Sequence, residues 1–295
     1  MQRLPLNEWQ ARQRRHRDRL HAPLTERSDQ MAAGLKHPVQ DFLFSYYSFR
    51  PGHLQRWSPG AEVFLEGAKR SDLDWGKEYE TRENGLILSA RSFPTHRLSF
   101  LEWAIGYFRG IAERPPSYNC FGLHEWAMVY RAPEVRHAAT PLRLSREEIA
   151  RVVDAEGLRC THYDAYRFFT PEAVPLNRLP LARTTTVEHD QKGCLHVAMD
   201  LYRYAFKIAP WTSGELVADA FFLAREARTI DMRASPYDLR AFGLEPIRIE
   251  SREGREEYVE LQRELSHRAE PLRERLIGEY QSIRRHLQSP AQISR

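Results

Sequence analysis

Three short segments of the chain combine a cysteine, a histidine and a carboxylate. They are CFGLHE (120–125), CTHYD (160–164) and CLHVAMD (194–200), and they contain all three cysteines of the chain. Thiols, imidazoles and carboxylates are the side chains that move protons and bind transition metals. Because the combination recurs three times, we expect the segments to converge on one polar pocket that is catalytic or metal-binding.

One chemistry that these residues could support is metal binding. His124, His162 and His196 would supply three imidazoles to a divalent ion such as zinc or iron and leave a position open for water. His196 and Asp200 have the i, i+4 spacing that brings two side chains together on a helix. The sequence has neither an HExxH motif nor a CxxC pair. The structural alternative is that the cysteines are small buried residues and the histidines are hydrogen-bonded core residues.

The other chemistry is acid–base catalysis without a metal. A carboxylate beside a histidine orients the ring and raises its pKa. Glu125, Asp164 and Asp200 are the candidate carboxylates, and each could activate water or stabilise a developing cation. The alternative for each is a helix cap or an arginine partner. For Asp231, which precedes Met-Arg, and Asp238, which follows Pro-Tyr, we expect structural roles.

Aromatic residues accompany the polar ones and would suit a pocket for a flat base, which needs stacking and hydrogen bonds together. The same residues would equally suit an ordinary core. They are Trp126, Tyr130, Tyr163, Tyr166, Phe168, Phe169, Tyr202 and Tyr204.

Helical patterns surround these segments. Apolar residues recur with the helical period over 100–113, and Pro115 follows. A short helix is expected over 122–130. Ser145, with a glutamate three residues later, has the capping-box signature and predicts a helix over 146–156.

The clearest pattern predicts a helical hairpin. The first helix should cover 189–208, with a core stripe of Leu195, Met199, Tyr202 and Phe206. The second should run from a cap at Ser213 to about Arg233, with an inner stripe of Val217, Phe221, Ala224 and Ala227. We expect the two stripes to pack against each other antiparallel.

The predicted fold is therefore mainly α, a single helical domain with a minor β element in the N-terminal third. Residues 1–35 should form a basic N-terminal helix, whose arginines either face phosphate or form a solvated surface. Residues 36–290 should form the single mainly helical domain. Within it, 58–92 should contain loops and a small hairpin, and 253–287 should form a last charged helix.

Composition limits the class of protein. The 295 residues are 42% apolar, which excludes a disordered chain, and no apolar run is long enough to span a membrane. The N-terminus lacks the apolar centre of a signal peptide, so a cytoplasmic protein with reduced thiols is expected. A net charge of +4 is mild for a nucleic-acid binder. No G-x-G, P-loop or G-x-S-x-G motif is present.

Several long stretches resemble a known family. They include NCFGLHEWAMVYR (119–131), CTHYDAYRFFTPEAVPLN (160–177), GCLHVAMDLYRYAFKIAP (193–210) and TIDMRASPYDLRAFGLEP (229–246). They are similar to a mainly actinobacterial family whose members commonly carry the name 3-methyladenine DNA glycosylase, and the resemblance covers most of the chain. It implies a hydrolase that acts in DNA repair by removing alkylated purines, and it assigns no catalytic residues.

The leading expectation is therefore cleavage of an N-glycosidic bond, in DNA or in a related nucleoside. The reaction needs a carboxylate to stabilise the sugar cation or activate water, and a proton donor to the leaving base. Asp200, Asp164 and Glu125 are the candidate carboxylates, with His196 as the partner of Asp200. The alternatives are a metal-dependent enzyme acting on a small molecule through the histidines, and a non-catalytic ligand-binding protein.

Overall fold

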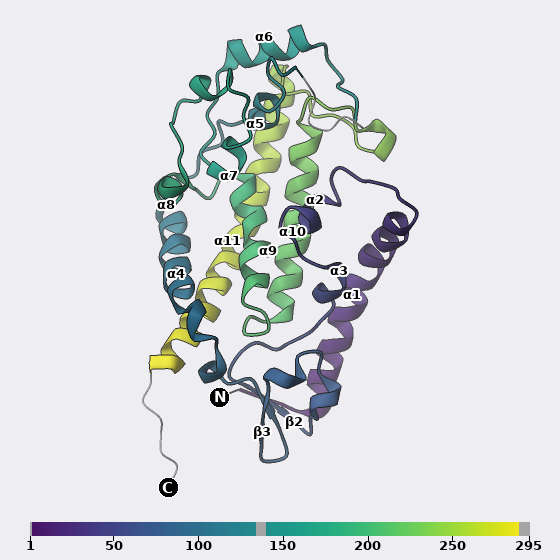
Figure 1. Cartoon of the computed structure of the whole chain (residues 1–295), viewed down its shortest axis with the longest axis vertical. Coiled ribbons are helices and arrows are strands. Elements are labelled where there is room, and N and C mark those ends of the chain that lie inside the picture. The colour runs from purple at the N-terminus through teal and green to yellow at the C-terminus, as the bar shows by residue number, and fades with distance from the viewer. Residues whose placement is uncertain (1, 134–139, 289–295) are drawn as a thin grey trace.

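The computed structural model describes residues 2–133 and 140–288, and it is mainly α, as the sequence predicts. A central group of helices is flanked by a long N-terminal helix, and a small sheet lies at one end of the molecule (Figure 1). The longer helices are α1 (Leu6–Ala32), α4 (Leu98–Glu113), α6 (Arg146–Glu156), α9 (Leu195–Lys207), α10 (Gly214–Arg233) and α11 (Arg252–Gln288). The short ones are α2 (Phe42–Ser45), α3 (Pro51–Leu54), α5 (Leu123–Ala127), α7 (Tyr163–Tyr166) and α8 (Thr186–His189).

The predicted hairpin is formed by α9 and α10, which lie side by side at the centre (Figure 1). The predicted inner stripe of α10 is buried throughout. In the α9 stripe Leu195, Met199 and Tyr202 are buried, whereas Phe206 is only partly buried and contacts Phe49 with ring centroids 4.5 Å apart. The hairpin is therefore confirmed, and Phe206 lies at the edge of its core.

The predicted start of the first hairpin helix is wrong. Residues 190–194 interrupt the helix, and α9 begins at Leu195. The side-chain oxygen of Gln191 accepts hydrogen bonds from the backbone N–H groups of Gly193 (2.7 Å) and Ser117 (2.8 Å). These bonds hold a tight turn against residue 117, so the chain cannot continue as a helix. The turn also directs Asp190 into the interior, where it is fully buried.

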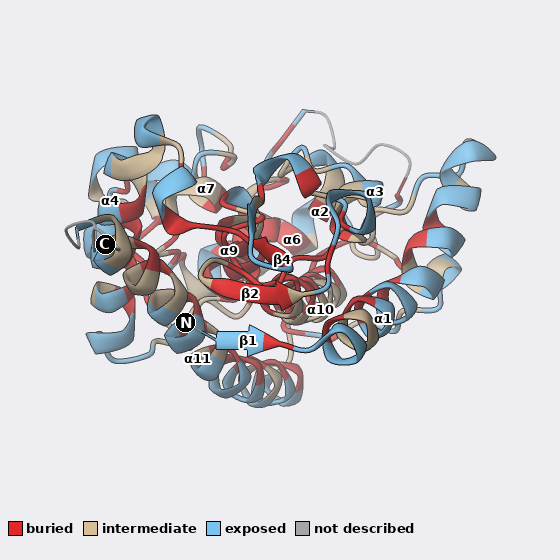
Figure 2. Ribbon diagram, turned by 90° about the horizontal axis from the view of Figure 1, so that it is seen from below, coloured by how far each residue is buried: buried red, intermediate tan, exposed pale blue. Residues whose placement is uncertain are grey.

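The small sheet has four strands in the order β1-β2-β4-β3: β1 (Gln2–Leu4), β2 (Val63–Glu66), β3 (Glu80–Arg82) and β4 (Gly85–Ile87). The antiparallel pair of β3 and β4 is the hairpin expected within 58–92. The sequence did not predict β1, which pairs in parallel with β2 and opens the chain just before α1 (Figure 2).

Helix α1 is joined to the rest of the molecule by packing and by charge. Its Trp9 and Leu20 belong to the central hydrophobic cluster. Three of its arginines form ion pairs with other elements: Arg12 with Glu215, Arg17 with Asp74 and Arg19 with Asp219. Much of the positive charge of the predicted basic helix is therefore neutralised within the chain.

The capping box of α6 is present as predicted, because Ser145 Oγ accepts from the backbone N–H of Glu148 and the Glu148 carboxylate accepts from that of Ser145. Helices α4 and α11 also agree with the predicted ranges within two residues. Among the described residues, no helix combines the length and the apolar character needed to cross a membrane.

Candidate functional site

The three histidines of the recurring segments come together at the centre of the molecule. The ring of His196 on α9 lies between the others, with centroids 4.6 Å from His124 and 5.2 Å from His162. The expected convergence is therefore observed. The expectation that all three line one cavity is wrong, because His162 faces a cavity of about 680 Å³ while His124 and His196 face a separate small one.

His124, at the start of α5, lies against Asp231 near the end of α10. Its Nε2 atom is 2.7 Å from Oδ1 of Asp231, and both side chains are buried. Its Nδ1 atom contacts the sulfur of Cys120 at 3.4 Å. Burial alone would lower the pKa of His124, but the charges of Asp231 and Cys120 outweigh it and hold this pKa well above its usual value.

Asp231 is also part of a buried ion-pair group. One nitrogen of Arg228 lies 2.8 Å from Oδ2 of Asp231 and 2.7 Å from Oε1 of Glu125. The same guanidinium lies over the ring of Phe42 at 4.1 Å. A buried arginine needs such partners, so Glu125, a predicted catalytic residue, here has the arginine partner that was its structural alternative.

His162 has a different carboxylate partner. Its Nδ1 atom lies 3.0 Å from Oδ1 of Asp190, whose other oxygen accepts a hydrogen bond of 2.6 Å from the hydroxyl of Tyr107. Burial opposes protonation, but the charge and hydrogen bond of Asp190 raise the pKa of His162 to about 9. The sequence reasoning missed Asp190, because in a continuous helix over 189–208 this residue does not belong to the predicted core stripe.

Asp200 lies on the buried side of α9, one turn after His196. Its Oδ1 atom accepts a hydrogen bond of 2.8 Å from the hydroxyl of Tyr47, and its Oδ2 atom lies 3.7 Å from Arg203. The expected pairing of Asp200 with His196 is not formed, because these two partners direct the carboxylate away from the ring. Burial raises the pKa of Asp200, although nearby positive charges oppose the shift.

Asp164 on α7 lies beside Asp200 across Arg203. Its carboxylate is 3.1 Å from the same Arg203 nitrogen and 3.2 Å from Arg167. Its side chain is 28% exposed, whereas that of Asp200 is 6% exposed. Two neighbouring carboxylates therefore have contrasting environments, one paired and accessible, the other buried.

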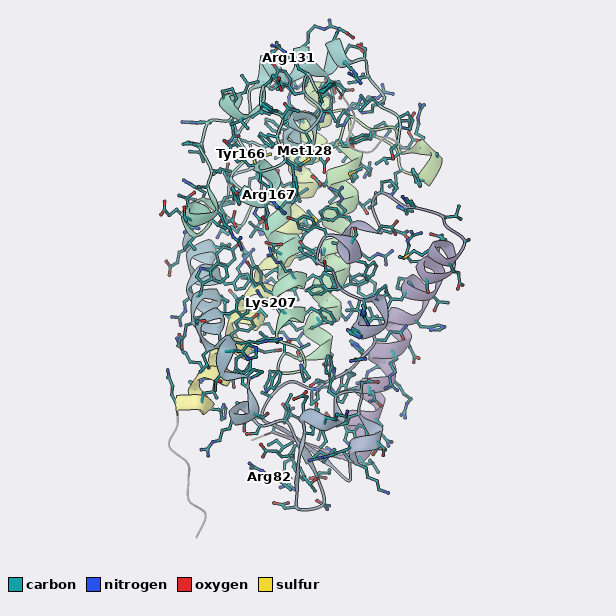
Figure 3. The ribbon with its side chains drawn as sticks, in the orientation of Figure 1. Arg82, Met128, Arg131, Tyr166, Arg167 and Lys207 are labelled. Carbon is teal, nitrogen blue, oxygen red and sulfur yellow. The ribbon has the colours of Figure 1, made fainter. Side chains whose placement is uncertain are left out.

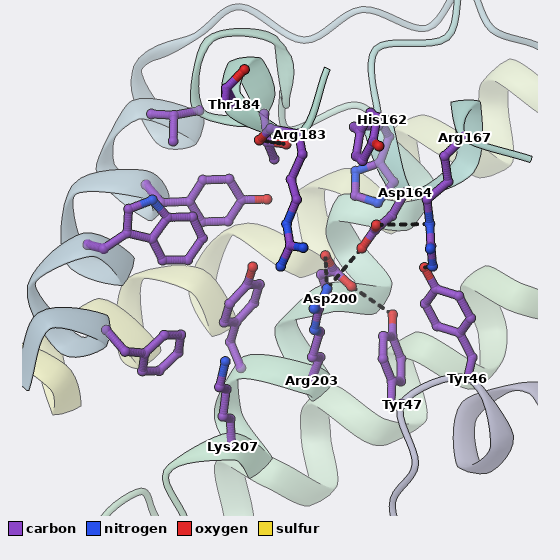
Figure 4. Close-up of a pocket in the computed structure, with 17 residues that line it drawn as sticks. Tyr46, Tyr47, His162, Asp164, Arg167, Arg183, Thr184, Asp200, Arg203 and Lys207 are labelled. Atoms are coloured by element: carbon purple, nitrogen blue, oxygen red, sulfur yellow. Dashed lines mark hydrogen bonds and ion pairs between the residues drawn. The ribbon is translucent and has the colours of Figure 1, made fainter. Parts of the chain in front are cut away.

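Both carboxylates face a cavity of about 680 Å³ (Figure 4). Its aromatic walls come from the two residues after α2 and from α4, α7 and α9: Tyr46, Tyr47, Phe100, Trp103, Tyr107, Tyr163 and Tyr204. The rings of Trp103 and Tyr107 stack with centroids 4.9 Å apart. Of the aromatics singled out from the sequence, Tyr163 and Tyr204 line this cavity, while Trp126, Tyr130 and Tyr202 are buried in the core.

Four cationic side chains also line the cavity. Two of them, Arg183 and Lys207, form no ion pair with a described residue and are called the uncommitted cations here. Arg167 and Arg203 pair with the carboxylates. The side chain of Arg183 forms no hydrogen bond or ion pair with any residue that the structure describes, and it extends from the 3-10 turn at 183–185 toward Asp200 (Figure 4). Lys207 lies over the ring of Phe100 at 4.1 Å. Arg167 and Lys207 lie at different heights along the middle of the molecule, far from Arg82 at the sheet end (Figure 3).

A candidate metal-ligand group lies beside this cavity. One atom each from His124, His196 and Asp231 lies within 4.8 Å of the other two. Asp231 thus takes the third place that the sequence reasoning assigned to His162. The three cysteines line the small cavity next to this group, together with His124 and His196.

Comparison with known proteins finds no matching family model, and no curated protein or solved structure is significantly similar to this chain. The function must therefore be argued from the two carboxylates, the cavity that they face and the group of histidines beside it.

Proposed function

We propose that the protein is a hydrolase that cleaves the N-glycosidic bond of a nucleotide or nucleoside in the large cavity. The observation that carries the proposal is the pair of unlike carboxylates. Asp164 and Asp200 lie 3.1 and 3.7 Å from one nitrogen of Arg203, and both line the cavity. Enzymes that cleave glycosidic bonds separate the roles of two carboxyl groups by giving them different environments.

The environments suggest which group does what. Asp164 is paired with two arginines and partly exposed, and its carboxylate can stabilise the positive charge that develops on the sugar. Asp200 is buried, and its raised pKa favours the protonated form that can act as an acid.

The proposed reaction balances without a further reagent. The bond between the sugar carbon and the base nitrogen breaks, its electron pair leaves with the base, and Asp200 gives that base a proton. Water then forms a bond to the sugar carbon, and its proton returns to Asp200. The products are the free base and the hydroxylated sugar.

The walls of the cavity suit a flat base. Stacking of one base on an aromatic side chain contributes about 1–3 kcal/mol, and the paired rings of Trp103 and Tyr107 offer such a surface. A volume of about 680 Å³ is within the range of small-molecule sites. The uncommitted Arg183 and Lys207 would bind an anionic group, which favours a nucleotide over an uncharged nucleoside.

The ion pairs of α1 favour a small substrate over duplex DNA, because a DNA-binding surface needs arginines that are available to contact phosphates. Three arginines of α1 are paired with carboxylates of the chain itself. The sequence resemblance to proteins named as DNA glycosylases supports the same bond as the target, and alkylated DNA therefore belongs among the substrates to be tested.

The test is release of free base, measured by chromatography, from a panel of nucleosides, nucleotides and alkylated DNA. Asp200→Asn should lower the rate on the best substrate by about 10²-fold without changing the melting temperature. Asp154→Asn is the matched control, because Asp154 also accepts from a tyrosine and pairs with an arginine but lies outside the cavity. Binding without base release would instead support a ligand-binding protein. Absence of both would overturn the proposal.

A further inference from the structure

The group formed by His124, His196 and Asp231 has the dimensions of a metal site. Its three donor atoms come from α5, α9 and α10, and all lie within 4.8 Å of one another. Bonds of about 2.0–2.2 Å from nitrogen or oxygen to zinc place two ligand atoms roughly 3–4 Å apart. His124 Nε2 and Asp231 Oδ1, now 2.7 Å apart, would separate slightly and His196 would move closer, so that one ion could contact all three atoms.

Two of these atoms have no other partner. His124 Nε2 and Asp231 Oδ1 are buried and lie 2.7 Å apart, yet neither has a hydrogen bond of acceptable geometry within the described part of the chain. Native proteins rarely leave buried polar atoms unsatisfied, and a missing ion is one accepted explanation. An ion between the imidazole and the carboxylate would satisfy both atoms.

In His124 and Asp231, the polar atom that would not bind the ion already contacts another side chain. Nδ1 of His124 contacts the sulfur of Cys120 at 3.4 Å, and Oδ2 of Asp231 lies 2.8 Å from Arg228. Such outer contacts are typical of metal ligands, because they fix the orientation of the ring and the carboxylate. They leave Nε2 and Oδ1 as the atoms directed at one another.

His162 is not a suitable third ligand, although it lies close to His196. The two rings are stacked with an angle of 15° between their planes. Because a histidine binds a metal in the plane of its ring, two stacked rings direct their nitrogens along parallel planes rather than at one point. Nδ1 of His162 is also bound to Asp190 at 3.0 Å.

We propose that His124, His196 and Asp231 bind one divalent transition-metal ion, of the zinc or iron(II) class. Two imidazoles and one carboxylate are a donor set that these ions accept, and three protein ligands leave a position open. His196 also lines a second cavity of about 230 Å³, whose walls include Phe42 and Phe168.

The test starts from protein purified without an affinity tag and stripped with a chelator. Zn²⁺, Fe²⁺ under anaerobic conditions and Co²⁺ are then titrated, with elemental analysis and the visible spectrum of bound Co²⁺ as readouts. The wild type should bind one ion per chain. Asp231→Asn and His196→Gln should each weaken binding by at least about 10²-fold. Circular dichroism and melting temperature establish that each variant is folded, and His196→Gln leaves the Arg228 ion pair in place.

His162→Gln is the matched control, because it removes a neighbouring buried histidine that is not a proposed ligand. This variant should keep one ion per chain with affinity within about threefold of the wild type. Stoichiometric binding in folded Asp231→Asn, an equal loss in His162→Gln, or no binding by the wild type would each overturn the proposal. A thiolate charge-transfer band in the Co²⁺ protein would also overturn it, because the cysteines would then be ligands. Metal content does not depend on base release, so this result is separate from the test of the hydrolase.

Discussion

At the scale of single residues, Asp200 shows how burial and a few contacts define a chemical role. Its carboxylate is buried away from water. It accepts a hydrogen bond from the hydroxyl of Tyr47 and lies 3.7 Å from the guanidinium of Arg203. Burial of this carboxylate raises the pKa of Asp200, because the charged form loses its contact with water. Asp164, next to it, has two close arginines and no comparable burial.

The first prediction concerns the pH dependence of base release. If Asp200 is the acid, kcat/KM should fall as the pH rises through its raised pKa, because the group then loses the proton that it donates. Asp200→Asn should lower kcat/KM by about 10²-fold and abolish this alkaline decline. The control Asp154→Asn should keep both the rate and the decline. An unchanged profile in Asp200→Asn would assign the acid to another residue.

The second prediction concerns the uncommitted cation of the cavity. Arg183→Gln should raise KM for a nucleotide by about tenfold, because the phosphate would lose a charged partner. The KM for the corresponding nucleoside should change little. Arg178→Gln is the control, since Arg178 is an exposed arginine of the same region that does not line the cavity. Equal effects on the nucleotide and the nucleoside would show that Arg183 does not recognise phosphate.

At the scale of elements, the turn before α9 positions Asp190 itself and, through the start of α9, His196. It directs Asp190 into the interior, toward His162, and sets the point at which α9 begins. Gly193 makes the turn possible, because a Cβ atom there would lie 2.6 Å from the carbonyl oxygen of Ser117. A backbone atom cannot move aside as the end of a flexible side chain can.

The third prediction follows from this close approach. Gly193→Ala should lower the free energy of unfolding by about 1–3 kcal/mol, because the turn must open to admit the methyl group. Gly278→Ala in α11 is the control: nothing lies within 4 Å of its added Cβ, so alanine should instead stabilise the helix by about 0.5–1 kcal/mol. Denaturant unfolding of both variants provides the measurement. A Gly193→Ala protein as stable as the wild type would show that the contact with Ser117 is not restrictive.

At the scale of the whole molecule, the distribution of charge bears on the kind of substrate. The net charge is +4, and the arginines at positions 12, 17 and 19 of α1 are engaged within the chain. Affinity for DNA depends on the number of phosphates that a protein neutralises, since each contact releases counterions. The arginines of α1 that pair with carboxylates of the chain are therefore less available for such contacts.

The fourth prediction is that the affinity of the protein for duplex DNA is low and falls only slightly as the salt concentration rises. Proteins with about six to ten phosphate contacts lose roughly 10³–10⁵ in affinity between 50 and 200 mM salt. This protein should lose much less, as measured by fluorescence anisotropy over the same range, and the small-molecule substrates should be turned over at either salt concentration. A steep salt dependence would favour DNA as the substrate of the proposed hydrolase.

Local features of the fold could be predicted from the sequence. The start of α6 follows from a capping box that involves residues three apart, and α4 follows from apolar periodicity. Such signals act within a turn or two of helix, so they are present in any short window of the chain. The start of α9 could not be predicted, because one of the hydrogen bonds that hold the turn before it comes from Ser117, more than 70 residues away.

The sequence by itself determined which side chains are available for chemistry, and the recurring segments led to His124, His162, His196 and the acids beside them. Only the tertiary structure decided their partners. Tyr47 reaches Asp200 across 153 residues, and Arg228 reaches Glu125 across 103. The physical reason is that residue type sets what a group can do, whereas packing sets its burial and its neighbours. Those surroundings, not the spacing along the chain, determine whether a carboxylate accepts a proton, holds an arginine or faces a metal.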